Sequence, residues 1–143
     1  VIEYNCRFGD PEAQVVLPLL DCDLLEVMIA VSEGRLADAD GRIRDGCAAC
    51  VIVASGGYPG KYQTGYEISV PEDAADSIIY AGVRASGDKI FTSGGRVLGV
   101  TATAKTLKEA LDEAYAKAAK VKFENAFYRR DIGKKALCAA EAK

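Results

Sequence analysis

Three polar residues near the start of the chain, Glu3, Asn5 and Arg7, follow one another at intervals of two. The segment 1–5 alternates apolar and polar residues, as a β-strand does, and side chains two apart on a strand point to the same side. A carboxylate, an amide oxygen and a guanidinium on one face suit a magnesium ion with phosphate groups. A solvent-exposed strand face without function would show the same spacing, so both interpretations stay open.

Two glycine-rich turns could bind an anion. They are Ser55-Gly56-Gly57-Tyr58-Pro59-Gly60 and Ser93-Gly94-Gly95-Arg96, and each follows a predicted strand. Paired glycines let backbone N–H groups approach an anion closely, and Arg96 would add a forked donor. Ordinary turn chemistry is the alternative for each loop. Arg129-Arg130-Asp131 could likewise clamp a phosphate or form a surface ion pair.

Composition excludes several classes of function. The chain has 143 residues, 18 Lys and Arg against 21 Asp and Glu, and no His. Without histidine there is no Ser-His triad and no His-ligated metal. The acidic balance argues against nucleic acid as a partner, and no apolar run is long enough for a membrane span. We therefore expect a cytoplasmic protein that binds neither nucleic acid nor membrane.

The five cysteines are expected to be reduced, because their number is odd and no secretory signal opens the chain. Cys47 and Cys50 form a CxxC pattern inside an apolar run predicted as a strand. Residues three apart on a strand point to opposite faces, which favours two small buried side chains over a metal or redox pair.

Hydrophobic periodicity predicts helices in the first part of the chain and strands in the second. One helix is expected to start at Asp10-Pro11-Glu12 and another at a cap on Asp23, before the polar segment 36–46. Five strands are then predicted: 47–54, 66–70, 78–83, 89–92 and 96–103. Thr106 and Glu109 form a capping box that opens a further helix, and the tail 123–137 alternates aromatic and charged residues.

These elements predict an α+β fold with a helical segment 1–36 followed by an antiparallel β-rich domain 37–143. The Ser86-Gly87-Asp88 turn predicts a hairpin, which requires antiparallel pairing. The chain starts with Val1, and its only methionine is Met28. We therefore expect a processed chain or a fragment whose N-terminal edge lies within a domain.

Four motifs, in the same order, resemble phosphoribosylamine–glycine ligases. The first, Glu3-Tyr4-Asn5-Cys6-Arg7-Phe8-Gly9-Asp10-Pro11-Glu12, resembles the last core motif of the ATP-grasp domain in that family. The two glycine-rich loops, the second extended through Val97-Leu98 and Val100-Thr101-Ala102, resemble the loops of the family's C-terminal domain. Tyr128-Arg129-Arg130-Asp131-Ile132-Gly133 resembles its C-terminal signature. The resemblance spans essentially the whole chain.

The resemblance implies a role for each of these residues in the complete ligase, which joins phosphoribosylamine and glycine with ATP in purine synthesis. Glu3 and Asn5 would bind Mg (or Mn) on the ATP phosphates, and Arg7 would stabilise the transferring phosphoryl group. The loop of Gly94, Gly95 and Arg96 would lie near the phosphoribosyl group. Segment 1–36 would be the end of an ATP-grasp domain.

The resemblance also implies that segment 37–143 is a small domain of the hybrid-motif type that packs on the missing ATP-grasp and N-terminal domains. The chain alone would then be inactive. Three alternatives remain open. The first is the tail of a related purine carboxylase or formyltransferase, although the Tyr-Arg-Arg-Asp-Ile-Gly and Gly-Gly-Tyr-Pro-Gly stretches argue against it. The others are a non-catalytic phosphosugar-binding or interaction module, and a structural module with an apolar patch on its N-terminal helices.

Overall fold

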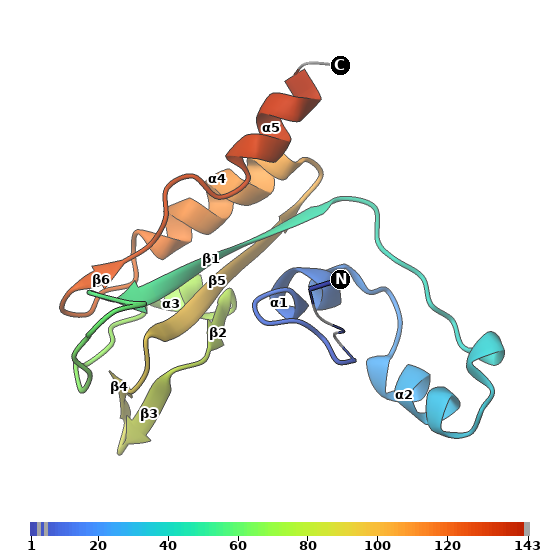
Figure 1. The fold of residues 1–143 in the computed structure, drawn as a ribbon, viewed down its shortest axis with the longest axis horizontal. Helices are drawn as coiled ribbons and strands as arrows, with labels where there is room; N and C mark the ends of the chain where they lie inside the picture. The colour runs from blue at the N-terminus through green and yellow to red at the C-terminus, as the bar shows by residue number, and fades with distance from the viewer. Residues whose placement is uncertain (3, 5, 142–143) are drawn as a thin grey trace.

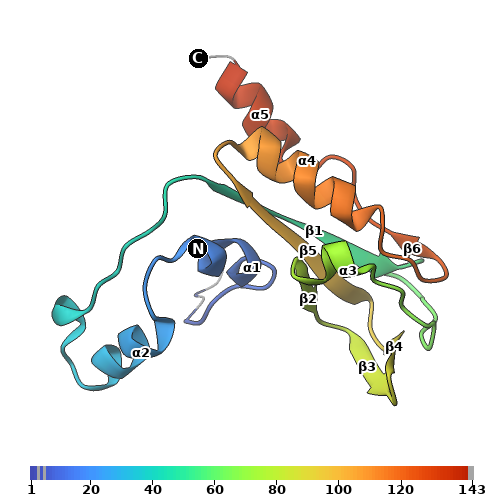
Figure 2. The ribbon, with the colours of Figure 1, turned by 180° about the vertical axis from the view of Figure 1, so that it is seen from behind.

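The structure, a computed structural model, describes residues 1–2, 4 and 6–141. Two long strands cross the centre of the molecule, with helix α4 (Leu107–Ala118) on one face and the N-terminal segment near α1 (Ala13–Val16) on the other (Figure 1). Helix α2 (Leu24–Ser32) lies farther out, away from the sheet (Figure 2). The expected mixture of helices and antiparallel sheet is confirmed. Among the described residues, no helix has the length and apolar character of a membrane span.

The main sheet has four antiparallel strands in the order β2-β5-β1-β6. These strands are β1 (Cys47–Ser55), β2 (Ile78–Tyr80), β5 (Arg96–Ala104) and β6 (Ala126–Phe127). A second, two-stranded sheet pairs β3 (Val83–Ser86) with β4 (Lys89–Thr92). Ser86 is opposite Lys89, so the predicted hairpin and strand 89–92 are confirmed.

The core lies between the main sheet and α4, because the register of β1 and β5 brings one set of alternating side chains to that face. Val51 is opposite Val100, and Val53 is opposite Leu98. The buried face of α4 consists of Ala110, Leu111, Ala114 and Ala118, and its small alanines let the helix approach the sheet closely. The predicted capping box is present: Thr106 Oγ1 accepts from the Glu109 N–H at 3.3 Å, and the Thr106 N–H donates to the Glu109 carboxylate at 3.0 Å.

The N-terminal segment is helical but more broken than expected. Helix α1 and the 3-10 turn η1 (Leu17–Leu19) form one short unit, and α2 is followed by a second 3-10 turn, η2 (Leu36–Asp38). Asp23 caps α2 as predicted, since its carboxylate accepts from the Leu25 and Glu26 N–H groups. The cap predicted at Asp10 is wrong: α1 begins at Ala13, and the Asp10 carboxylate is used elsewhere.

Two predicted strands differ from the structure for reasons of pairing. Segment 66–70 forms only isolated bridges, at Glu67 and Ser69, instead of a continuous ladder. Segment 78–83 is split between β2 and β3, because the chain turns at Gly82, where an added Cβ would lie 2.6 Å from the Arg96 carbonyl oxygen. The strand expected at 1–5 includes Glu3 and Asn5, which lie outside the described residues.

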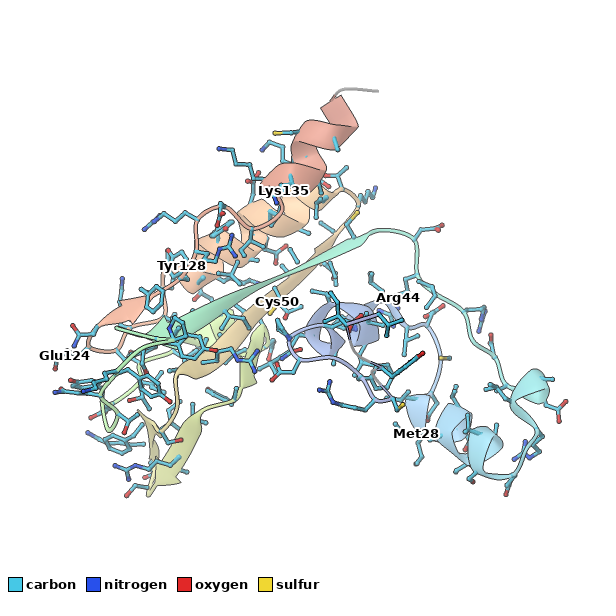
Figure 3. All side chains as sticks on the ribbon, in the orientation of Figure 1. Met28, Arg44, Cys50, Glu124, Tyr128 and Lys135 are labelled. Atoms are coloured by element: carbon cyan, nitrogen blue, oxygen red, sulfur yellow. The ribbon has the colours of Figure 1, made fainter. Side chains whose placement is uncertain are left out.

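The C-terminal tail contains β6 and a helix, α5 (Lys134–Glu141), that the aromatic and charged alternation does not indicate. Gly133, with φ +75°, turns the chain into α5. At the other end of the molecule, Met28 of α2 lies well away from Cys50 on β1 (Figure 3). Leu25, Met28 and Val31 of α2 are all exposed. This is the apolar patch that a packing role for the N-terminal helices predicts.

Candidate functional site

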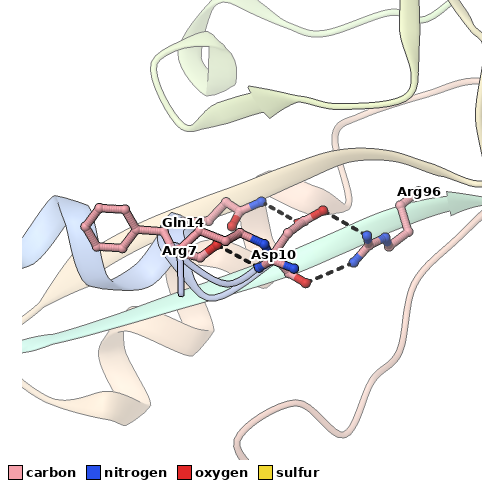
Figure 4. A network of polar contacts seen from close by, with 5 residues as sticks. Arg7, Asp10, Gln14 and Arg96 are labelled. Atoms are coloured by element: carbon pink, nitrogen blue, oxygen red, sulfur yellow. Dashed lines mark hydrogen bonds and ion pairs between the residues drawn. The ribbon is translucent and has the colours of Figure 1, made fainter. Parts of the chain in front are cut away.

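An ion pair joins the N-terminal segment to the start of β5. Arg96 Nη2 lies 2.8 Å from Asp10 Oδ2, and Arg96 Nη1 donates to the Asp10 carbonyl oxygen at 3.3 Å (Figure 4). The other Asp10 oxygen accepts from Gln14 Nε2 at 3.1 Å. The Arg96 side chain is 38% exposed and that of Asp10 is 57% exposed, so the contact faces solvent. The structure thereby brings together two motifs that are 86 residues apart.

The two glycine-rich loops lie side by side at the end of the central strands. The Ser55 N–H donates to the Gly95 carbonyl at 2.8 Å, and Ser55 Oγ donates to the Gly94 carbonyl at 2.9 Å. A Cβ on Gly95 would collide with the Tyr58 ring, so a glycine is needed where the loops pass. The loops predicted separately therefore form one surface, and Arg96 connects it to Asp10.

Arg7 lies three residues before Asp10 in the sequence and is exposed. Its Nη1 donates to the adjacent Phe8 carbonyl at 2.8 Å (Figure 4). A mostly apolar groove of about 430 Å³, lined in part by Phe8, Asp10 and Gln14, lies beside it. The predicted metal ligands Glu3 and Asn5 lie outside the described residues.

A second hollow, of about 380 Å³, borders the first glycine-rich loop. Its lining residues are Gly56, Lys61, Tyr62, Gln63, Tyr66 and Asn125. Asn125 adopts φ 62°, a left-handed conformation that asparagine tolerates better than most residues. Sequence reasoning missed Asn125, since its only signal is a residue type that favours turns.

The Arg129-Arg130-Asp131 motif forms a surface ion pair, one of its two predicted alternatives. Arg129 Nε and Nη2 donate to the two Asp131 carboxylate oxygens at 2.9 and 2.7 Å. The Tyr115 hydroxyl donates to the Arg129 carbonyl at 2.9 Å and accepts from the Ile132 N–H at 3.0 Å, which fixes the backbone of this turn. The Arg130 guanidinium lies 5.2 Å from the centre of the Tyr128 ring.

The Arg129–Asp131 pair should make stability depend on pH. The hydrogen bond from Arg129, followed by its charge, holds the pKa of Asp131 below the ordinary value of 3.8. The stabilising contribution is thus complete above pH 3.8 and is lost as the pH falls through the lower folded pKa. Asp131→Asn should lower the thermal midpoint at neutral pH but not in strong acid. Asp45→Asn is the control, and an equal loss at both pH values for Asp131→Asn would contradict this.

The two cysteines of the CxxC pattern face opposite sides of β1, as predicted. Cys47 packs against the core, and Cys50 Sγ lies beside Gly99 on the face that carries Gln14. Burial raises the pKa of the Cys50 thiol, and the neighbouring Thr101 side chain acts in the opposite direction. A raised pKa leaves less of the reactive thiolate at neutral pH.

The Asp10–Arg96 pair should hold α1 against the sheet. A double-mutant cycle with Asp10→Asn and Arg96→Gln measures the coupling between the two side chains in the free energy of unfolding. We expect a coupling free energy of about 0.2–1 kcal/mol, because both groups are partly exposed. Either single variant should also speed hydrogen exchange at the Ala13 amide, which donates to the Gly9 carbonyl at 2.8 Å.

The exposed pair Lys108–Asp112 lies within one turn of α4 and provides the matched control. Breaking it should leave exchange at Ala13 unchanged. Additive unfolding energies, together with unchanged exchange in both Asp10→Asn and Arg96→Gln, would show that the pair does not fix this segment.

The arrangement of helices and antiparallel sheet is similar to part of a solved enzyme. The match is to the crystal structure of a phosphoribosylamine–glycine ligase from Thermotoga maritima, with a TM-score of 0.74 and 37% sequence identity. It covers 92% of this chain and 32% of that chain. The fold is therefore that of one portion of a larger ligase. Residues 48–135 match the family model described as phosphoribosylglycinamide synthetase, C domain, and the chain belongs to this family.

Curated relatives agree with this assignment. The chain is 49% identical to a phosphoribosylamine–glycine ligase of Chlorobaculum tepidum, over 96% of this chain and 33% of that protein. It is 48% identical to the ligase of Synechocystis, over 96% of this chain and 34% of that protein. The bifunctional purine biosynthetic protein PUR2,5 of Pichia angusta is 45% identical over 96% of this chain and 18% of its own. The chain thus spans about a third of the bacterial relatives, and the predicted family is confirmed.

Proposed function

We propose that this chain forms the C-terminal part of an ATP-dependent ligase that joins 5-phosphoribosylamine and glycine to give glycinamide ribonucleotide, ADP and phosphate. One observation carries the proposal: residues 48–135 match the C-domain family. The bacterial relatives named for this activity align over 96% of the chain, so their similarity extends well into the segment that precedes residues 48–135.

Glu3 and Asn5 would hold Mg²⁺ (or Mn²⁺) on the ATP phosphates. A carboxylate and an amide oxygen are hard donors, so the donor set fits such an ion. The metal would offset negative charge on the phosphates when bound. Arg7 would donate to the phosphoryl oxygens as the glycine carboxylate attacks. Among the described residues, its guanidinium bonds only to the Phe8 carbonyl.

The loop of Gly94, Gly95 and Arg96 would border the phosphoribosyl group. Arg96 would mainly position the N-terminal segment and would not itself bind the substrate, because Asp10 already accepts from its guanidinium. That contact holds the segment that follows Arg7 against the glycine-rich surface. The nucleotide side and the sugar side of the reaction would thereby be kept in one fixed arrangement.

Segment 1–36 would be the end of an ATP-grasp domain, and segment 37–143 would be a C-terminal domain of the hybrid-motif type. The exposed apolar face of α2, with Leu25, Met28 and Val31, would pack on the remainder of the ligase. The isolated chain would be inactive, because the groups that bind adenine would lie in that remainder.

A chimera tests the proposal. This chain would replace the matching third of the Chlorobaculum tepidum relative, and the product would be assayed for ADP release that depends on both glycine and phosphoribosylamine. We expect activity in the chimera and none in the 143-residue chain alone. A folded chimera without activity would contradict the assignment, and turnover by the isolated chain would contradict its dependence on the rest of the ligase.

A further inference from the structure

The hollow between the first glycine-rich loop and the tail has the chemistry of an anion site. It measures about 380 Å³, and none of the described residues that line it is acidic. We propose that this hollow, here called the Lys61 pocket, binds the phosphate group of a sugar phosphate. That the sugar phosphate is the ligase's own substrate rests on the proposed function.

Lys61 supplies the positive charge of the pocket. It forms no ion pair with any residue that the structure describes, whereas Arg96 pairs with Asp10 and Lys89 pairs with Glu67. A phosphate monoester carries about 1.5 to 2 negative charges near neutral pH, so an unpaired ammonium is a suitable partner. Among the cations near the glycine-rich loops, Lys61 is therefore better placed to bind an anion than Arg96.

A short hydrogen bond orients the amide of Gln63. The Tyr66 hydroxyl donates to Gln63 Oε1 at 2.7 Å, which leaves the amide NH₂ group to donate to a ligand. Tyr62, whose ring centre lies 6.1 Å from that of Tyr58, adds an aromatic surface to the lining. A cation, an amide donor and an aromatic surface together suit a phosphate that carries a sugar better than they suit bare phosphate.

The wall of the pocket consists of backbone held in place by close contacts. A Cβ on Gly56 would lie 2.8 Å from both the Cβ and the carbonyl oxygen of Asn125, so the loop and the tail touch directly. Gly57, with φ +98°, continues the turn in a conformation that side chains rarely adopt. The loop is thereby pre-shaped, which lowers the ordering cost of binding.

The pocket adjoins the second glycine-rich loop. Ser55, which precedes Gly56, bonds to the carbonyls of Gly94 and Gly95. A Cβ on Gly95 would lie 3.0 Å from Cε1 of Tyr62, a pocket residue. Arg96 then contacts Asp10, three residues after Arg7. The Lys61 pocket therefore borders the loop that Arg96 connects to the N-terminal segment.

Titration of the 143-residue chain with ribose 5-phosphate, followed by amide chemical shifts, tests the pocket. We expect shifts at Gly56 and Gly57 and a Kd that rises about 10- to 100-fold in Lys61→Gln, as loss of a charged hydrogen bond predicts. Lys61→Arg should keep most of the affinity. Lys105→Gln is the matched control, since Lys105 is exposed and forms no ion pair with a described residue. Equal effects of Lys61→Gln and Lys105→Gln, or no shift at the loop, would overturn the proposal.

Two further probes separate the parts of the ligand. Ribose alone should bind much more weakly than ribose 5-phosphate if the phosphate is the anchor. Inorganic phosphate should compete at Lys61 but with lower affinity. Equal affinity of phosphate and ribose 5-phosphate would refute a contribution from the sugar, and equal affinity of ribose and ribose 5-phosphate would refute the phosphate site.

The chimeric ligase distinguishes failure of this pocket from failure of the proposed function. In an active chimera, Lys61→Gln should raise KM for phosphoribosylamine about 10-fold or more and leave kcat nearly unchanged. This is expected because Lys61 would bind the phosphate equally well in the ground state and in the transition state. An active chimera with unchanged KM would overturn the pocket and leave the ligase assignment intact. If the chimera is inactive but ribose 5-phosphate still binds at Lys61, the ligase assignment would be overturned and the pocket would stand.

Discussion

Replacing Arg7 with alanine in the chimeric ligase is expected to lower kcat about 100- to 1000-fold, the cost typical of losing one donor to charge that develops in a transition state. Binding of ATP should change much less, because other parts of the ligase would hold the nucleotide. Steady-state kinetics with ATP and glycine varied separately would measure both quantities.

The loss of kcat in Arg7→Ala can be distinguished from a loss of stability. Arg7 is exposed, and within the described part of the chain its guanidinium bonds only to the adjacent Phe8 carbonyl, so its removal should cost little stability. Arg7→Lys should recover part of kcat, since it keeps the charge but loses the planar fork. Arg42→Ala, at an exposed arginine of segment 36–46, is the control. An unchanged kcat in Arg7→Ala would remove this residue from the reaction.

Replacing Leu98 with alanine is expected to lower the free energy of unfolding by about 2–5 kcal/mol, because it leaves a cavity in a packed core. Leu98 is 0% exposed. It lies opposite Val53 on β1 and opposite Tyr80 on β2, so the cavity would open where three strands meet. Denaturant unfolding of the chain, followed by circular dichroism, would measure the change.

Leu25→Ala provides the same chemical change at a surface position. Leu25 lies on α2 and is 64% exposed, so the expected loss is below about 0.5 kcal/mol. Similar losses for Leu25→Ala and Leu98→Ala would mean that the core is not centred on the contact between β1, β5 and α4.

Elements governed by local sequence were predicted well. Strand 89–92 and the hairpin before it agree with β4 and its pairing, because a turn glycine and alternating side chains are short-range signals. The cap at Asp23 and the box of Thr106 and Glu109 were also correct, since each needs only backbone N–H groups within three residues.

Elements governed by distant contacts were predicted poorly. The break at Gly82 depends on how closely β5 approaches, and nothing nearby in the sequence indicates it. Asp-Pro-Glu favours a helix cap at Asp10 locally, but Arg96 binds the Asp10 carboxylate from across the molecule. Helix α5 was missed because its apolar residues gain a partner only when the tail folds back on the core.

By itself, the sequence determined the family, the α+β class, the order of most elements and the residue types available for chemistry. Those properties depend on composition, periodicity and short motifs, which any stretch of chain carries independently of the rest. Only the tertiary structure decided that the two glycine-rich loops form one surface, that Arg96 is occupied by Asp10, and that Lys61 is left without an ion pair to a described residue. Each of those facts depends on which distant charged and backbone groups come into contact, and local sequence does not indicate those contacts.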